Sequence, residues 1–266
     1  MNKRILFIGG GNMAEGIIRG IINGKVMEPS QICVSEILKA RCEYLKDTYK
    51  INICENLQES VKTANILLFA IRPQNAESAL SQIKNIISEK HIIISIVAGL
   101  NIEKIKVYTN PESKIVRVMP NVLIEAKHGY SALCISDKVG EEEIKTVSSI
   151  FEAIGQTMVI DEKLFNEFTA FSCAGPAYVM YFINSMIDAG VEAGFSRNDA
   201  RNIVLENMIG SGLMLQLTGK HPYQITDQMT SPAGVTIAGL HTLNSLGFNG
   251  IVMDAISDAV ERSNKL

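Results

Sequence analysis

Residues 4–14 read Arg-Ile-Leu-Phe-Ile-Gly-Gly-Gly-Asn-Met-Ala, and they indicate the class of fold. The first five residues form a nearly all-apolar run that ends in glycine, which is typical of a parallel strand covered on both faces. An amphipathic helix follows at once, because Met13, Ile17 and Ile21 recur on one of its faces. The stretch therefore predicts a buried strand, a tight glycine turn and a helix.

The glycines of this turn have the spacing of a dinucleotide-binding motif, Gly-x-Gly-x-x-Ala. Gly9 permits the tight turn, Gly11 lets the backbone approach a pyrophosphate, and Ala14 is small enough for the helix to lie against the strand. The backbone N–H groups at the start of the helix then receive the negative charge. We expect a dinucleotide to bind here.

Strands and helices alternate along the first part of the chain, which predicts a Rossmann-like, doubly wound parallel sheet with right-handed crossovers. Helices are expected over residues 38–46 and 76–88. The expected strands are residues 4–8, 31–35, 51–54, 65–71, 91–97 and 114–119. We expect this dinucleotide-binding domain to comprise residues 1–160.

The pattern changes after about Asp161, because apolar residues then recur at spacings of three and four through long segments rich in Ala, Met and Gly. Residues 161–266 are therefore expected to form an all-helical domain. Its predicted helices are residues 162–171, 176–193, 197–218, 222–229, 232–245 and 248–264. So much apolar surface on so short a domain indicates that a second subunit completes its core, as in a homodimer.

The composition of the chain limits the classes of ligand and partner that it can bind. The chain has 266 residues and a net charge of −3, so it offers no broad basic surface to nucleic acid or an anionic membrane. No apolar run approaches the roughly 18–20 residues of a membrane span, and the glycine turn ends the N-terminal run too early for a signal peptide. The five cysteines are widely spaced and include no Cys-x-x-Cys pair, so neither a disulfide framework nor a metal site is indicated. We expect a cytoplasmic protein that binds a small molecule.

The preferred dinucleotide depends on the end of the second strand, Ser35-Glu36. An acid at this point accepts hydrogen bonds from a ribose 2′-hydroxyl and repels a 2′-phosphate, which favours NADH. Lys39 and Arg41 follow closely and offer cations to a 2′-phosphate if Glu36 turns outward. Both NADH and NADPH therefore stay open.

Two segments of the helical half differ from ordinary helix packing. Residues 171–178 read Phe-Ser-Cys-Ala-Gly-Pro-Ala-Tyr, and residues 230–236 read Thr-Ser-Pro-Ala-Gly-Val-Thr. Each combines small residues, hydroxyls and proline at an expected helix start, where free backbone N–H groups suit a substrate carboxylate. Plain capping of the two helices is the alternative interpretation.

At this point the sequence resembles the pyrroline-5-carboxylate reductase family along nearly its whole length. Besides the glycine turn, the matching motifs are Ala70-Ile71-Arg72-Pro73, Ser95 to Leu100, Arg117-Val118-Met119-Pro120-Asn121, Gly175-Pro176-Ala177-Tyr178, His221-Pro222 and Ser231 to Ile237. Together these motifs are far more specific than a nucleotide fingerprint alone.

The resemblance implies reduction of Δ1-pyrroline-5-carboxylate to L-proline, the last step of proline biosynthesis, by an NADPH- or NADH-dependent homodimer or a ring-like assembly of dimers that uses no metal. Thr236 matches the threonine that holds the substrate ring nitrogen. The segments that match the carboxylate site contain Ser172, Ala174, Gly175, Pro176, Ser231, Gly234 and Val235. The positions that match the cofactor site are Ile8, Gly9, Gly10, Gly11, Asn12 and Met13 for the pyrophosphate, Ser35, Glu36 and Asn56 for the adenosine, and Ala70, Ile71, Arg72, Pro73, Ile96, Val97, Ala98 and Gly99 for the nicotinamide ribose.

Three positions depart from the family pattern: Cys173, Ala174 and Ala233 stand where Gly, Ser and Gly are usual. Backbone contacts to a carboxylate survive these changes if the local φ stays negative. The remaining alternatives are a reductase of another imine, a β-hydroxyacid dehydrogenase, and a non-catalytic redox sensor that binds dinucleotide. The dehydrogenase class places a catalytic lysine on an early helix of its helical domain, and residues 177–193 contain no lysine.

Overall fold

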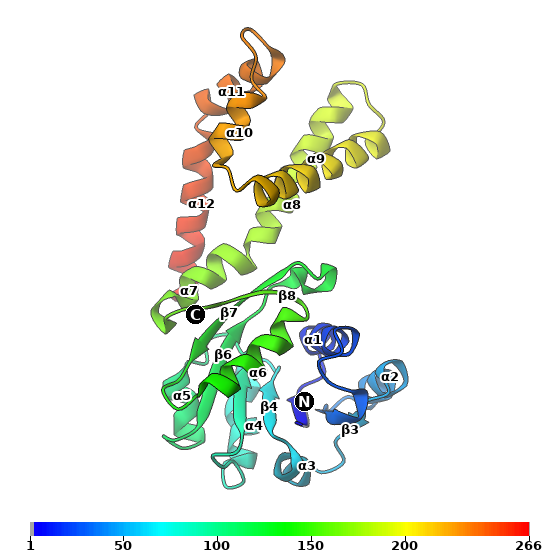
Figure 1. The fold of residues 1–266 in the computed structure, drawn as a ribbon, viewed down its shortest axis with the longest axis vertical. Coiled ribbons are helices and arrows are strands. Elements are labelled where there is room, and N and C mark those ends of the chain that lie inside the picture. Colours follow the sequence, from blue (N-terminus) through cyan, green and yellow to red (C-terminus); the bar gives the residue numbers. More distant parts are fainter. Residues whose placement is uncertain (1–2, 266) are drawn as a thin grey trace. The chain divides into compact units, whose positions relative to one another are not determined.

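The computed structural model describes residues 3–265, which divide into two compact units (Figure 1). The first unit ends at Cys173 and contains a sheet with its covering helices, and the second, Ala174–Lys265, is helical. The predicted fold class, a Rossmann-like doubly wound sheet followed by a helical region, is confirmed.

The sheet has eight strands in the order β3-β2-β1-β4-β5-β6-β7-β8. All six strands expected from the sequence are present and pair in parallel; Ile5, for example, lies opposite Ile32 on one side and Ile66 on the other. The strands are β1 (Ile5–Ile8), β2 (Ile32–Ser35), β3 (Asn52–Ile53), β4 (Ile66–Phe69), β5 (Ile92–Ser95), β6 (Lys114–Met119), β7 (Gly129–Ile135) and β8 (Gly155–Val159).

Each central strand is buried on both faces. Successive side chains point to opposite sides, so Ile5 and Phe7 join one apolar cluster while Leu6 and Ile8 join the other. Helices α1, α2 and α6 contribute to the first cluster, and α3, α4 and α5 to the second. These helices are α1 (Asn12–Asn23), α2 (Lys39–Tyr49), α3 (Leu57–Thr63), α4 (Pro73–Ile83), α5 (Ile102–Tyr108) and α6 (Glu141–Glu152).

The last two strands were not predicted, and they make the sheet mixed. β7 runs antiparallel to β6, and β8 is parallel to β7. Residues 120–128 join β6 to β7, with only a 3₁₀ helix, η2 (Val122–Ala126), between them. A parallel crossover needs a dozen residues or more, so the chain turns back and pairs antiparallel.

The segment after β8 packs on the sheet. The helix expected over residues 162–171 is present as a 3₁₀ turn (Glu162–Leu164), helix α7 (Phe165–Phe168) and a π-helical turn (Thr169–Cys173). Phe165 is 1% exposed and belongs to the second apolar cluster. The first compact unit therefore extends beyond the domain limit expected at residue 160.

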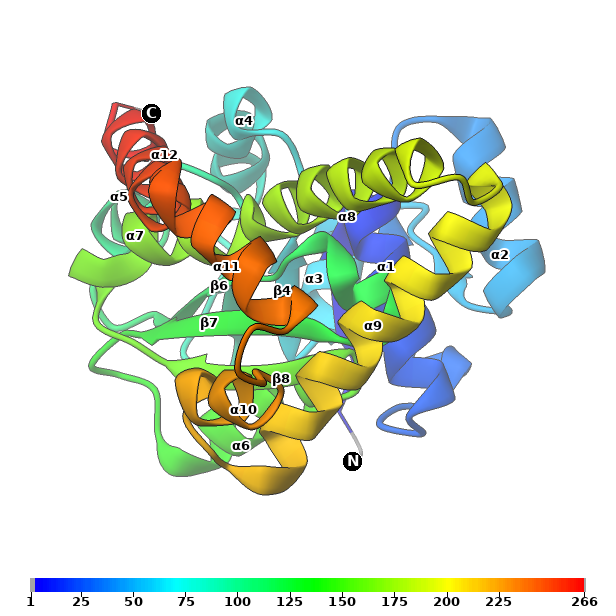
Figure 2. The same cartoon turned by 90° about the horizontal axis from the view of Figure 1, so that it is seen from above.

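The helical unit contains five helices close to the predicted ranges: α8 (Gly175–Glu192), α9 (Arg197–Thr218), α10 (Pro222–Gln228), α11 (Val235–Ser245) and α12 (Phe248–Ser263). Helices α8 and α9 form a hairpin joined by residues 193–196 (Figures 1 and 2). Gly190 brings them close, because a Cβ there would lie 2.8 Å from that of Ala200. None of the helices within residues 3–265 has the length and apolarity needed to cross a bilayer.

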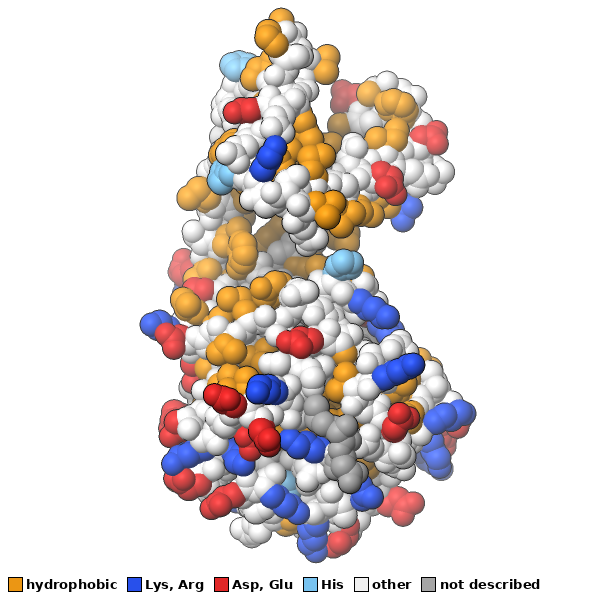
Figure 3. All heavy atoms as spheres, viewed as in Figure 1, with side chains coloured by type: hydrophobic (Ala, Val, Ile, Leu, Met, Phe, Trp, Pro, Cys, Tyr) orange, Lys and Arg blue, Asp and Glu red, His pale blue; other side chains and the backbone are white. Residues whose placement is uncertain are grey.

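Charge and apolar surface are unevenly distributed between the units. Figure 3 shows acidic and basic side chains over the first unit and hydrophobic side chains over several helices of the second. No residue of α8, α11 or α12 is buried. The helical unit therefore leaves most of its apolar side chains uncovered.

Candidate active site

The glycine turn follows β1 at the point where the strand order reverses. From β1 the chain continues to β2 and β3 on one side and then returns to β4 on the other side of β1. Ligands of open α/β sheets bind outside the carboxyl ends of the strands at such a switch point. The predicted dinucleotide motif therefore lies where the topology favours a ligand.

Gly9 needs to be glycine for two reasons. Its φ is +102°, a conformation that L side chains rarely adopt. A Cβ at this position would also lie 2.5 Å from the carbonyl oxygen of Ala70. The turn is fixed by a 2.8 Å hydrogen bond from the Gly9 N–H to the carbonyl of Ser35.

Gly11 precedes helix α1 and leaves its first turn open. It is the N-cap residue, with φ −68° and ψ −177°, and no side chain caps the helix. No heavy atom lies within 4 Å of where its Cβ would stand, and Gly11 and Asn12 are both exposed. The residues present thus fit a pyrophosphate, because uncapped N–H groups and the positive end of the helix dipole meet a side-chain-free surface.

The predicted nicotinamide segments lie beside this turn. The Ala70 N–H donates to the Ile8 carbonyl at 2.9 Å, and the Ile96 N–H donates to the Phe69 carbonyl at 3.1 Å. The structure thereby brings the ends of β1, β4 and β5 together at one edge of the sheet. A cavity of about 650 Å³ lies beside the turn that follows β5, and it is lined by Ala98, Gly99, Leu100 and residues of α4 and α5.

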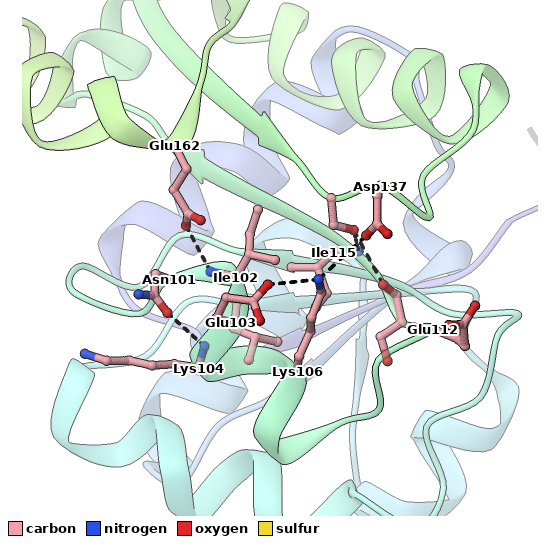
Figure 4. Close-up of polar contacts among 12 residues, drawn as sticks. Asn101, Ile102, Glu103, Lys104, Lys106, Glu112, Ile115, Asp137 and Glu162 are labelled. Carbon is pink, nitrogen blue, oxygen red and sulfur yellow. Dashed lines mark hydrogen bonds and ion pairs between the residues drawn. The ribbon is translucent and has the colours of Figure 1, made fainter.

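Helix α5 begins just after these segments and is held at its start by two side chains (Figure 4). Asn101 Oδ1 accepts a hydrogen bond from the Lys104 N–H at 2.8 Å, and Glu162 Oε1 accepts one from the Ile102 N–H at 2.9 Å. Glu162 also pairs with the buried Arg117 guanidinium of β6 at 3.1 Å. The turn over residues 96–99 is thus fixed between β5 and an anchored helix.

At the adenosine end, Glu36 turns its carboxylate inward. Oε2 accepts a hydrogen bond from the Gly10 N–H at 2.9 Å, and Oε1 accepts from the N–H groups of Ile37 and Leu38 at 2.8 and 2.9 Å. Burial raises the pKa of Glu36, but these three N–H groups outweigh it and leave that pKa below its ordinary value. Glu36 therefore stays ionised next to the glycine turn.

Asn56 has a local partner as well. It is exposed and caps α3, because its Oδ1 accepts a hydrogen bond from the Glu59 N–H at 3.2 Å. Its proposed contact with the adenosine stays a prediction.

The first unit also holds the start of the predicted carboxylate site. Asn121, directly after β6, donates from Nδ2 to the carbonyl oxygen of Ser172 at 3.2 Å and to its Oγ at 3.3 Å. Asn121 is 5% exposed, and its Oδ1 accepts from the Leu123 N–H at 3.2 Å. The sequence motif ending at Asn121 was visible, but it gave no indication that this residue holds Ser172.

Cys173 is half-buried in the same turn. Its Sγ lies 3.6 Å from the carbonyl oxygen of Pro120. Burial raises its pKa to about 11, so the thiol is protonated at neutral pH. This environment is the opposite of the one that activates a nucleophilic cysteine.

The remaining predicted substrate residues lie in the helical unit at two helix starts. Ala174, Gly175 and Pro176 open α8, whose N-cap Ala174 makes no side-chain hydrogen bond. Gly234 is the N-cap of α11, which also lacks a side-chain cap, and its N–H donates to the Ser231 carbonyl at 3.0 Å. The N–H groups of the first turn of α11, which includes Val235 and Thr236, therefore have no side-chain acceptor from their own N-cap.

At one of these turns the condition set for the backbone contacts is not met. Ala233 has a φ of +56°, so the condition that φ stays negative where the family has glycine is not met. The conformation is one that glycine adopts freely and alanine adopts only with strain.

Each of the two units contains a segment that matches a model of a known protein family. Residues 4–99 match the model of the NADP oxidoreductases that depend on coenzyme F420, and residues 162–266 match the pyrroline-5-carboxylate reductase dimerisation model. The pyrroline-5-carboxylate reductase of Synechocystis sp. is 34% identical over 100% of this chain and 99% of its own length. Two solved structures are similar: a Coxiella burnetii pyrroline-5-carboxylate reductase (TM-score 0.94, 25% identity, 100% and 98% of the two chains) and the Plasmodium falciparum pyrroline carboxylate reductase with NADP bound (TM-score 0.87, 33% identity, 98% and 97%).

The glycine turn at the switch point of a doubly wound sheet, together with the match of residues 4–99 to an NADP oxidoreductase model, places the chain among the nicotinamide-dinucleotide oxidoreductases. With full-length relatives at this level of identity, the chain belongs to the pyrroline-5-carboxylate reductase family.

Proposed function

We propose that the protein reduces Δ1-pyrroline-5-carboxylate to L-proline, with the sheet unit binding the dinucleotide and the helical unit binding the substrate and a second subunit. The main support is the family relationship over the full length of the chain, together with uncapped helix starts in both units. A β-hydroxyacid dehydrogenase and a non-catalytic redox sensor are both less consistent with that relationship.

The residues of the site perform few chemical tasks. When bound, the reduced nicotinamide supplies a hydride to the imine carbon, and the π electrons of the C=N bond move to nitrogen. The first-turn N–H groups of α11 hold the substrate carboxylate, and the Thr236 hydroxyl holds the ring nitrogen and its proton. Because an imine enters already protonated, the protein contributes mainly by orientation.

The adenosine end favours NADH. Glu36 is ionised and fixed to the Gly10 N–H, so it places a negative charge beside the turn where a 2′-phosphate would have to lie. A free 2′-hydroxyl can instead donate a hydrogen bond to the Glu36 carboxylate.

The test is reduction of pyrroline-5-carboxylate by the purified full-length protein with NADH and with NADPH. Turnover with at least one dinucleotide is expected, and NADH should give the higher kcat/KM. A folded protein that turns over with neither would disprove the assignment.

Thr236→Val is the matching variant, because it removes the hydroxyl and keeps the shape of the side chain. We expect kcat to fall about 100-fold, because the ring nitrogen is no longer held in the orientation for hydride transfer, while the KM for NADH stays within about twofold. Thr236→Ser should recover most of the rate. Thr242→Val, also on α11, is the control, and equal losses in both valine variants would remove Thr236 from its proposed role.

A further inference from the structure

Glu15 lies in the first turn of α1 and accepts hydrogen bonds from three side chains of α2. Arg41 Nη2 lies 2.5 Å from Oε2, and the hydroxyls of Tyr49 and Tyr44 lie 2.7 and 2.9 Å from Oε1. The Glu15 side chain is only 15% exposed. The contacts are specific enough to hold one orientation of the carboxylate.

Arg41 is held in this arrangement through Nε and Nη2. Besides its pair with Glu15, its Nε donates to the carbonyl oxygen of Gly10 at 2.6 Å, and its guanidinium lies 5.1 Å from the centre of the Tyr44 ring. A free arginine at this point of the fold is suited to a ribose 2′-phosphate, because its planar fork matches phosphate oxygens. Here the fork is directed at Glu15 and at the glycine turn instead.

Glu36 contacts the same residue, Gly10, through its N–H. The Gly10 N–H donates to Glu36 while the Gly10 carbonyl accepts from Arg41. The charged groups that contact Gly10 directly are thus Glu36 and Arg41, and Arg41 is itself paired with Glu15, so its positive charge already faces carboxylates. A dianionic 2′-phosphate would have to draw Arg41 away from Glu15 against the negative charge of these carboxylates.

The protonation states agree with this geometry. Burial raises the pKa of Glu15, but hydrogen bonds from Tyr49, Arg41 and Tyr44 outweigh it and lower that pKa below its ordinary value. Burial also raises the pKa of Tyr49 to about 12, with the hydrogen bond to Glu15 adding to the effect. At neutral pH Glu15 is therefore ionised and Tyr49 is a donor.

We propose that Glu15 is a specificity-determining residue of the dinucleotide site: by holding Arg41 it withholds the guanidinium from a 2′-phosphate and selects a dinucleotide with a free 2′-hydroxyl. The inference rests on the proposed dinucleotide site and explains its preference through a residue of α1 that the sequence motif does not include.

The test measures binding of ADP-ribose and ADP-ribose 2′-phosphate to the full chain by calorimetry, so that neither substrate nor hydride transfer is involved. The wild-type protein should bind ADP-ribose at least tenfold more tightly. Glu15→Gln should bind ADP-ribose 2′-phosphate more tightly and so reduce the preference for ADP-ribose at least fivefold. The double variant Glu15→Gln with Arg41→Gln should lose this tighter binding of the 2′-phosphate. Glu43→Gln removes an exposed acid from the same helix as Arg41 and should leave the ratio within twofold of wild type.

The outcomes separate the two proposals. If the wild type binds neither compound, the dinucleotide site itself is wrong; if it binds both equally or prefers the 2′-phosphate, the site stands and the role of Glu15 is overturned. If Glu15→Gln and Glu43→Gln change the ratio equally, the effect comes from the loss of any negative charge, and the specific role of Glu15 is overturned as well. Should Glu15→Gln fail to fold, Arg41→Gln alone decides. We expect it to leave the affinity for ADP-ribose 2′-phosphate unchanged. A fivefold loss of affinity confined to that compound would show that the guanidinium already binds the 2′-phosphate in the wild type and would overturn the proposal.

Discussion

Ala233 and Gly9 share a backbone feature that favours glycine, and only one of them is glycine. Both have positive φ values, +56° and +102°, and both lie in turns just before a predicted binding helix. For Gly9 the neighbouring Ala70 carbonyl excludes a side chain as well. The Ala233 side chain is exposed, so the turn tolerates it at the cost of backbone strain alone.

Ala233→Gly should therefore stabilise the protein. An alanine in the left-handed region costs about 1–2 kcal/mol, whereas the added freedom of glycine in the unfolded chain costs about 0.4–1 kcal/mol. The difference predicts a gain of about 0.5–1 kcal/mol in the free energy of unfolding, measured by urea denaturation. Ala193→Gly is the control, because Ala193 has a φ of −73° and only the entropic loss remains; a loss of stability in both variants would contradict the strain at Ala233.

At the scale of elements, Asn121 connects the end of β6 to the π-helical turn that carries Ser172. Asn121→Asp keeps the acceptor for the Leu123 N–H and removes the donor to Ser172. We expect the KM for pyrroline-5-carboxylate to rise about tenfold, equivalent to about 1.4 kcal/mol, because the Ser172 carbonyl oxygen then faces a carboxylate oxygen in place of a donor. The KM for NADH should stay within about twofold.

Asn65→Asp is the matched control for Asn121. Asn65 Oδ1 accepts from the Arg4 N–H at 2.9 Å, next to the start of β4, at the opposite edge of the sheet from the candidate site. Lower stability of Asn121→Asp with an unchanged substrate KM would show that Asn121 supports the fold and does not position Ser172.

The elements that could be predicted from the sequence are those whose burial shows as a pattern of apolar residues within the element itself. β1, β4 and β5 are buried at every position, so they read as continuous apolar runs. β8 is an edge strand with the sequence Gly-Gln-Thr-Met-Val and no buried residue, so no periodicity marks it. The glycine turn was predictable for the same local reason, because its three glycines are contiguous.

Contacts between distant segments were not predictable in this way. Asn121 and Ser172 are 51 residues apart, and Glu15 and Arg41 are 26 apart. No local pattern connects such pairs, since the topology of the sheet and the packing of α1 beside α2 bring them together. The motif thus located the pyrophosphate site, while the residues around it became apparent only in the structure.

At the scale of the whole molecule, the helical unit lacks a core of its own. Within Ala174–Lys265 the buried hydrophobic residues are Ala200, Val204 and Ile225, and large side chains such as Leu217 and Ile251 are 84% and 62% exposed. So few buried residues cannot offset the conformational entropy of five helices. We therefore propose that a second copy of the chain covers this surface, consistent with the dimerisation model that residues 162–266 match.

If folding of the helical unit requires association with a second copy, thermal stability depends on protein concentration. For a dimer that unfolds to two chains, a 100-fold increase in concentration adds about 2.7 kcal/mol, which spread over the unfolding entropy of both chains raises Tm by about 2 °C. Scanning calorimetry at 1 and 100 µM, with sedimentation to confirm twice the monomer mass, measures this. Replacing Ile251 and Met253 on α12 together by Glu should abolish the dependence, whereas Val107→Glu, equally exposed but on α5 of the sheet unit, should retain it. A monomeric wild-type protein with a Tm that does not change with concentration would contradict the proposed dimer and require another partner for the exposed helices.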